Sequence, residues 1–347
     1  ATIRKEANLY EFYRRLAGET EAQTLMQSLV AKSLVKSVAV EGGERRFLLL
    51  ETVRAYAAEQ LAAAGEEEAV RRRHAHQYAA RAERAGSGEA GGWPALAHDR
   101  PNLAAALHWL VQNDGAAALQ MVAALRDFWY MRGLFSEGRQ WAEAALRTAS
   151  AAAPNLRAGA LLALGQMLLN QGEATAAQTA LHEAVALLRS AGNLTACARA
   201  MIELGWATYL GHAEQASVRW FEQSLALARQ IGDAPLTAHA LTSLTHVLVY
   251  EGSYTPELHE YILQSIALYR QLGDAHGLAE ALLNLCTFLL QTDEPAAALA
   301  AAREAVAMAE HHQLASTRAW AYMVLAELLL LPSNDGLVEA QLHLDAA

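Results

Sequence analysis

The sequence predicts a mostly α-helical protein, namely a right-handed α-solenoid of helical hairpins that follows a small winged-helix-like segment with one β-hairpin. Three observations support this fold class. A helical unit with a period of about 40 residues recurs through the second half of the chain. Hydrophobic residues make up 53% of the 347 residues, which is enough to bury an extended core. A strand pattern appears in one short region near the N-terminus.

The repeated unit begins near residue 155. Its first helix contains the strings LALG, IELG, LTSLT, LLNLC and YMVLA, whose aligned small residues are spaced by 40, 40, 41 and 40 positions: Gly165, Gly205, Thr245, Cys286 and Ala326. Apolar residues recur at intervals of three and four, so each segment is an amphipathic helix. One hairpin cannot bury its own apolar face, whereas stacked hairpins can. The period therefore predicts a continuous helical stack.

The second helices end with similar regularity. They finish at Asn193, Asp233 and Asp274, each after a glycine that suits the left-handed position beyond a helix C-terminus. The arrangement of small and large residues matches tetratricopeptide repeats, but the longer period predicts helices about one turn longer. We expect a degenerate sixth unit before these repeats, at 126–133 and 138–149. We expect the last unit to start at Ser316 and to be cut short at Ala347.

The region before the repeats has a different pattern. Residues 21–33 are expected to form a helix, followed by strands at 34–40 and 45–50 around a Gly42-Gly43 turn. This order, completed by a helix at 51–65, is typical of the end of a winged-helix unit. Two further helices are expected at 71–85 and 101–113. We therefore predict three regions, which are a winged-helix-like segment, a helical arm and a repeat domain of about six hairpins: 1–65, 66–114 and 115–347.

Several strings resemble the bacterial STAND proteins, signal-transduction ATPases with numerous domains. These strings are LVAKSLV, FLLLETVRAYAAEQL, RRRHAHQYAARAERA, FWYMRG and GRQWAEAAL. DRPNLAAALHW is similar to the family's E-x-x-N-L-R-A-A-L element, but Asp99 replaces Glu and Ala104 replaces Arg, which we expect to weaken an ion pair there. The resemblance implies a winged-helix arm that holds an ATPase module shut, a repeat sensor, and an ATP- and Mg-binding module upstream of Ala1.

Charge is distributed unevenly along the chain. Residues 1–113 have a net charge of +1 and residues 114–347 a net charge of −11. Because an acidic surface repels phosphate, nucleic acid is an unlikely partner of the repeat domain. The longest apolar runs are too short to cross a membrane, and the two cysteines, Cys197 and Cys286, do not form a disulfide framework. We expect a cytoplasmic protein without a membrane partner.

Catalytic and metal-binding patterns are missing from the sequence. There is no G-x-x-x-x-G-K-[ST] loop, so we expect neither ATP hydrolysis nor a cofactor in this chain. His74 and His76 lie on different helix faces, and His311 and His312 are adjacent, so neither pair has the spacing of helical zinc ligands. No nucleophile and base can be paired from spacing. The chain is not predicted to be an enzyme.

A candidate groove follows from projecting the repeats. In tetratricopeptide stacks the first helix of each hairpin lines the concave surface, where aromatic rings mixed with donors and acceptors form a recognition site. The alternative is that aromatic residues such as Trp206 and Tyr209 simply fill the core. The projection also includes Leu210, Thr242, Ser243, Thr287 and Met323. The main groove candidates are Arg199, Glu203, Trp206, Tyr209, His239, His246, Tyr250, Glu280, Asn284, Gln291, Trp320 and Glu327.

Two functional hypotheses follow. In the first, the chain is the sensing region of a STAND regulator. Its groove binds an effector protein, peptide or small molecule, and the chain contacts the ATPase module intramolecularly. In the second, it is a DNA-binding winged-helix transcription regulator whose repeats bind an effector or oligomerise. The basic cluster at 71–73 directly follows the acidic residues at 66–68, which favours ion pairs on a solvated helix face over a phosphate contact.

Overall fold

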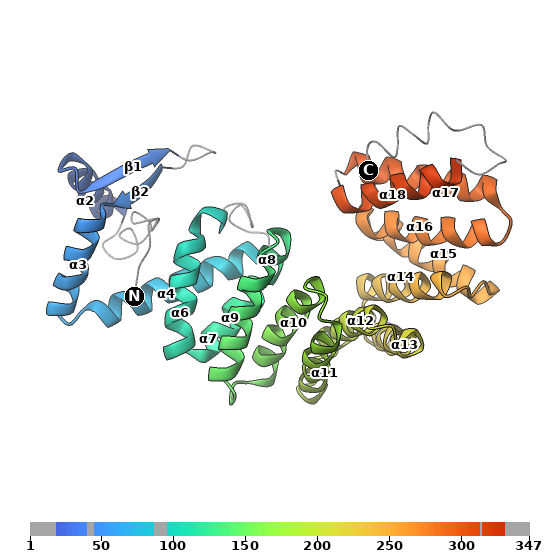
Figure 1. Cartoon of the computed structure of the whole chain (residues 1–347), viewed down its shortest axis with the longest axis horizontal. Coiled ribbons are helices and arrows are strands. Elements are labelled where there is room, and N and C mark those ends of the chain that lie inside the picture. The colour runs from blue at the N-terminus through green and yellow to red at the C-terminus, as the bar shows by residue number, and fades with distance from the viewer. Residues whose placement is uncertain (1–18, 40–44, 87–95, 313, 330–347) are drawn as a thin grey trace. The chain divides into compact units, whose positions relative to one another are not determined.

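The computed structural model describes residues 19–39, 45–86, 96–312 and 314–329 (Figure 1). It divides into two compact units, residues 1–172 and 173–347. Helices dominate both units and the described strands form one two-stranded sheet, which confirms the predicted mostly α-helical class. The three predicted regions, with their boundaries at residues 65 and 114, stay a prediction.

The first unit contains the following elements: α2 (Glu19–Ala31), β1 (Val35–Ala39), β2 (Arg45–Leu49), α3 (Glu51–Ala63), α4 (Glu67–Gly86), the 3₁₀ helix η1 (Ala97–Asp99), α6 (Arg100–Asn113), α7 (Gly115–Ala124), α8 (Arg126–Met131), α9 (Phe135–Thr148) and α10 (Pro154–Asn170).

The β-hairpin forms close to its predicted position. Strands β1 and β2 are antiparallel, with Val35 opposite Leu49 and Ser37 opposite Phe47. Met26 of α2 and Val35 are buried together, and Phe47 and Leu49 pack against them, so helix and hairpin share a small apolar core. The predicted Gly42-Gly43 turn lies outside the described residues.

Helices α4, α6, α7, α8, α9 and α10 share one apolar core, which includes the buried side chains of Phe128 and Trp129. The expected degenerate unit begins with the short helix α8, which follows the end of α7 at Ala124 after one intervening residue. The expected weakening of an ion pair between positions 99 and 104 stays a prediction. The Asp99 carboxylate is fully buried and lies 3.0 Å from the guanidinium of a different residue, Arg81.

The second unit is a stack of helices of nearly equal length: α11 (Ala174–Ser190), α12 (Leu194–Leu210), α13 (Glu214–Ile231), α14 (Ala234–Tyr250), α15 (Pro256–Leu272), α16 (Ala275–Gln291), α17 (Pro295–His311) and α18 (Ala315–Leu329).

A glycine followed by Asn or Asp lies between the second helix of one repeat and the first helix of the next, and it determines where these helices end and begin. Gly232 and Gly273 cap α13 and α15 with φ angles of 70° and 68°, which other residues rarely adopt. The next residues, Asp233 and Asp274, accept hydrogen bonds from backbone N–H groups of α14 and α16, at 2.9 and 3.0 Å. The dipeptide thus ends one helix and begins the next, as predicted for the helix ends.

Each first helix also contacts the first helix of the next hairpin. Such contacts join α12 to α14, α14 to α16 and α16 to α18, whereas the second helices α13, α15 and α17 approach one another less closely. The stack therefore curves toward its first helices, and these helices form its concave face. None of the helices in the described ranges is long and apolar enough to span a bilayer.

Candidate ligand-binding groove

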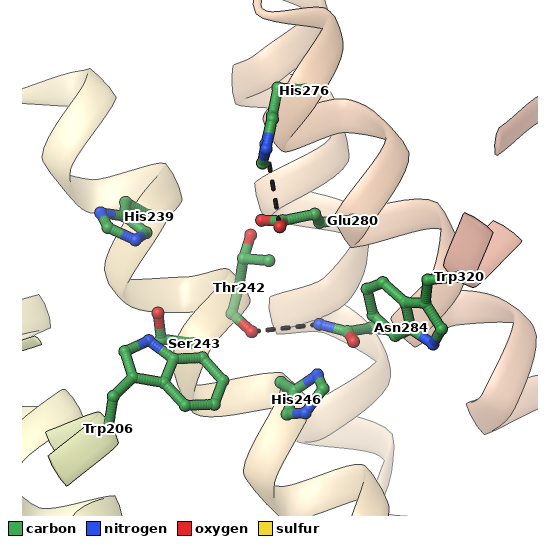
Figure 2. Close-up of a pocket in the computed structure, with 9 residues that line it drawn as sticks. All are labelled: Trp206, His239, Thr242, Ser243, His246, His276, Glu280, Asn284 and Trp320. Atoms are coloured by element: carbon green, nitrogen blue, oxygen red, sulfur yellow. Dashed lines mark hydrogen bonds and ion pairs between the residues drawn. The ribbon is translucent and has the colours of Figure 1, made fainter. Parts of the chain in front are cut away.

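A cavity of about 280 Å³ opens on the concave face of the second unit (Figure 2). Every residue that lines it belongs to a first helix, because these helices contact each other directly. Helix α12 contributes one residue, α14 four, α16 three and α18 one: Trp206, His239, Thr242, Ser243, His246, His276, Glu280, Asn284 and Trp320.

His246 lies at the centre of an aromatic cluster. Its ring centroid is 5.2 Å from that of Trp206 and 5.7 Å from that of Trp320, and the two indoles lie on either side of it in Figure 2. Tyr250 is 4.6 Å and Tyr209 6.4 Å from the same ring. The contact with Trp320 joins α14 to α18, so the indole reaches past the intervening helix α16 and walls one side of the cavity.

Asn284 joins two repeats beneath the cavity. It is 1% exposed, and its Nδ2 donates hydrogen bonds to the Thr242 carbonyl oxygen at 3.0 Å and to Thr245 Oγ1 at 3.2 Å. Because a carbonyl oxygen can only accept, these bonds fix the amide orientation. Oδ1 then faces the His246 ring, which is close enough to interact with it but makes no hydrogen bond of good geometry, and it has no other partner among the described residues (Figure 2).

The ionisable groups around the cavity have shifted pKa values. Burial lowers the pKa of His239, and Arg199 and His276 lower it further. Burial also lowers the pKa of His246, against the opposing effect of the Asn284 amide. Both rings are therefore neutral at neutral pH. Burial raises the pKa of Glu280, whose carboxylate lies 3.8 Å from His276 Nδ1, and the His276 charge opposes that rise.

The structure brings six of the main groove candidates into the cavity wall: Trp206, His239, His246, Glu280, Asn284 and Trp320. Tyr209 and Tyr250 contact His246 from beside it. The other four lie on the same first helices but do not line the cavity: Arg199, Glu203, Gln291 and Glu327. Thr242 and Ser243 from the wider projection line it, whereas Leu210, Thr287 and Met323 do not.

Sequence reasoning missed His276. It precedes Glu280 by four positions, so it lies one helical turn earlier on the same face. Extending the projected face by one turn toward the N-terminus of α16 would have included it.

Trp206 has both of the roles that the sequence left open, because it packs in the hairpin core and also lines the groove. Its indole lines the cavity, and its ring centroid is also 5.5 Å from that of Phe221, a fully buried residue of α13. Tyr250 differs, because 46% of it is exposed. A substitution at Trp206 therefore changes both the hairpin core and the groove, whereas one at Tyr250 changes the groove surface.

Within the described residues, no group of three or more His, Cys, Asp or Glu side chains is placed to hold a metal ion. His311 and His312 contact each other edge to face, with ring centroids 4.8 Å apart. His74 packs on Tyr78 at 4.7 Å, and His76 lies near Trp109 and Asp114. These histidines make contacts within and between helices.

The fold and the groove define a tetratricopeptide-like helical-repeat protein with an N-terminal winged-helix segment. Residues 14–62 match the family model of a winged helix-turn-helix domain. The chain is 32% identical over 218 residues to a Mycobacterium tuberculosis protein classed as an HTH-type transcriptional regulator. That alignment covers 59% of this chain and 24% of the relative, so the chain spans about a quarter of the length of the curated relatives it matches.

Solved structures share the repeat fold at low sequence identity. Aspartyl phosphate phosphatase F from Bacillus subtilis is 13% identical with a TM-score of 0.58, covering 98% of this chain and 82% of that protein. A STAND protein with a tetratricopeptide repeat sensor from Pyrococcus horikoshii is 13% identical with a TM-score of 0.51, covering 92% of this chain and 58% of that protein. These similarities show the fold.

Proposed function

We propose that this chain is the sensing and interaction region of a STAND-type signal-transduction ATPase. An effector protein, peptide or small molecule binds in the concave groove and shifts an autoinhibited equilibrium of a nucleotide-binding module encoded upstream. One observation carries the proposal, namely the cavity that first helices of successive repeats build around Oδ1 of Asn284. A ligand shifts such an equilibrium only through different affinities for the two states.

The winged-helix segment acts, in this proposal, as an arm that contacts the ATPase module. Side chains of α2 at Thr24, Gln27 and Ser28 are exposed and uncharged. A surface of this kind suits contact with protein better than contact with phosphate. The likeness in fold to the STAND repeat sensor supports the same assignment.

We further propose that the chain itself is not an enzyme and holds no cofactor, with ATP and Mg bound by the upstream module alone. A cytoplasmic location fits this role. Both cysteines, Cys197 and Cys286, are buried as free thiols, as is usual in a reducing compartment.

The test uses the full-length protein, whose upstream sequence we expect to contain a phosphate-binding loop with its lysine. Deletion of residues 173–347 should raise basal nucleotide hydrolysis several-fold, because the autoinhibiting region is lost. The isolated chain should not hydrolyse ATP above background. Unchanged turnover after the deletion, or an upstream sequence without such a loop, would contradict the proposal.

A DNA-binding transcription regulator is the second candidate, since residues 14–62 match a winged helix-turn-helix model and the curated relative is classed as a regulator. Binding of the chain to random duplex DNA, measured between about 50 and 200 mM salt, distinguishes the two candidates. Affinity that falls steeply with salt favours DNA binding. Absence of binding at the lower salt concentration favours the arm role.

A further inference from the structure

We infer that the cavity recognises an alkylammonium group, carried either by a free amine or by a lysine side chain of a peptide. This inference rests on the proposed function, because it names the ligand class of the same groove. It follows from three features of the cavity wall: the acceptors that remain open, the aromatic walls, and the charge of the surrounding groups.

Two hydrogen-bond acceptors of the cavity are open to a ligand. Asn284 Oδ1 is buried and makes no hydrogen bond of good geometry, since its neighbour, the His246 ring, interacts with it only weakly, so a donor from a ligand would complete its bonding. The Glu280 carboxylate is partly buried and lies 3.8 Å from its neighbour His276, which is longer than a hydrogen bond. Acceptors need donors, and an ammonium group supplies three of them.

The aromatic walls also suit a cation. Trp206 and Trp320 line the cavity on either side of His246 (Figure 2). The face of an indole carries negative potential and attracts an ammonium group, more strongly when water is excluded. The methylene chain that bears the ammonium group can pack against the same rings.

The charges that face the cavity disfavour an anion. His239 and His246 are held neutral by burial, so they do not offer positive charge at neutral pH. The residues that line the cavity include one acid, Glu280, and neither Arg nor Lys. A neutral apolar ligand would leave both acceptors without donors. An alkylammonium ligand can donate hydrogen bonds to both acceptors and can also contact the indole rings.

The test titrates the chain with four probes and follows tryptophan emission and ligand NMR signals. Pentylammonium is paired with 1-pentanol, and an acetylated, amidated Gly-Lys-Gly peptide is paired with its norleucine counterpart. Each charged probe should bind at least about tenfold more tightly than its neutral counterpart. The tighter of the two charged probes identifies the source of the ammonium group, free or peptide-borne.

Matched variants locate the binding. Glu280→Gln should weaken the charged probes about tenfold, whereas Glu222→Gln, on the exposed face of α13, should not. Trp320→Leu should weaken them at least about fivefold, and Trp320→Phe should retain most of the affinity, because it keeps an aromatic face. Circular dichroism of each variant confirms that it is folded.

Three results would overturn the inference: equal binding of charged and neutral probes, equal effects of Glu280→Gln and Glu222→Gln, or binding of none of the four. Neutral probes that bind and are lost with Trp320→Leu would refute the ammonium group and leave the groove as a binding site. The deletion experiment on nucleotide hydrolysis tests the proposed function separately.

Discussion

A single residue, Asn284, contributes both to the packing of two repeats and to the proposed ligand site. Its amide nitrogen holds α16 to α14, and its amide oxygen is left open in the cavity. The sequence placed Asn284 on the groove face, because repeat alignment fixes which face a residue occupies. It did not reveal the open acceptor, because that depends on which groups of the neighbouring repeat lie within hydrogen-bond distance.

Truncation of Tyr250 should mainly weaken ligand binding, whereas truncation of Leu181 should mainly lower stability. Tyr250→Ala removes an exposed ring that contacts His246, so we expect a change in unfolding free energy of about 0.5 kcal/mol or less. Binding of a groove ligand should weaken by about 1–2 kcal/mol. Leu181→Ala empties a fully buried site and should cost about 2–5 kcal/mol of stability. Thermal melts beside ligand titrations check this, and equal losses of melting temperature would make Tyr250 a core residue.

His74 should make the first unit sensitive to acid. Burial lowers its pKa from 6.5 to about 4, with a smaller opposing effect of Asn102. The folded state therefore binds fewer protons than the unfolded state between these values, and stability falls as pH drops through this range. At pH 5 the loss relative to neutral pH should be about 2 kcal/mol. Urea titrations across this range should show a smaller loss for His74→Phe, and an unchanged loss would contradict the assignment.

The helix is the scale at which sequence reasoning succeeded most fully. Repeat spacing located α12, α14, α16 and α18, and for the first three a preceding Gly followed by Asn or Asp has a fixed physical effect on helix ends. Helix α7 was not predicted, whereas the helix expected at 126–133 corresponds to α8. Residues 115–131 have few polar positions and no Pro to mark an interruption, so only packing around Trp129 separates α7 from α8.

Gly205 should tolerate no side chain, because its helix lies close to α13. A Cβ there would lie 2.5 Å from Phe221 Cε1. Gly205→Ala should cost about 1–3 kcal/mol of stability through overpacking, measured by urea denaturation. Gly211→Ala, at the end of the same helix, is the matched control, because its Cβ would meet the end of the flexible Gln178 side chain. A Phe221→Leu substitution should recover part of the loss in a double-mutant cycle. Equal costs for the two glycines would contradict this packing.

At the scale of the whole molecule, charge separates the two functional candidates. The net charge of −11 over residues 114–347 falls on the repeats, while residues 1–113 are nearly neutral. The charge distribution therefore predicts that the repeats avoid phosphate, and this stays a prediction. Length, composition and charge did not predict the cavity, because the reach of Trp320 to His246 depends on the curvature of the stack, which is set by small packing angles between hairpins.

Ligand binding in the groove should require α18 but not the residues after it. A chain ending at residue 329 keeps every lining residue and should bind the lysine peptide as the full chain does. A chain ending at residue 312 lacks Trp320 and should lose at least about fivefold in affinity. Fluorescence titration of both chains measures this. Equal affinities would show that α18 takes no part in the site.

The contact between His246 and Trp320 has a kinetic consequence. The cavity is closed on one side by Trp320 of α18, and a helical-repeat array can open locally at one repeat because each repeat contacts only its neighbours. Each opening of α18 would withdraw the indole and leave a bound molecule free to dissociate. A ligand that touches Trp320 would in turn slow that opening, so its residence time and the hydrogen-exchange protection of α18 should rise and fall together.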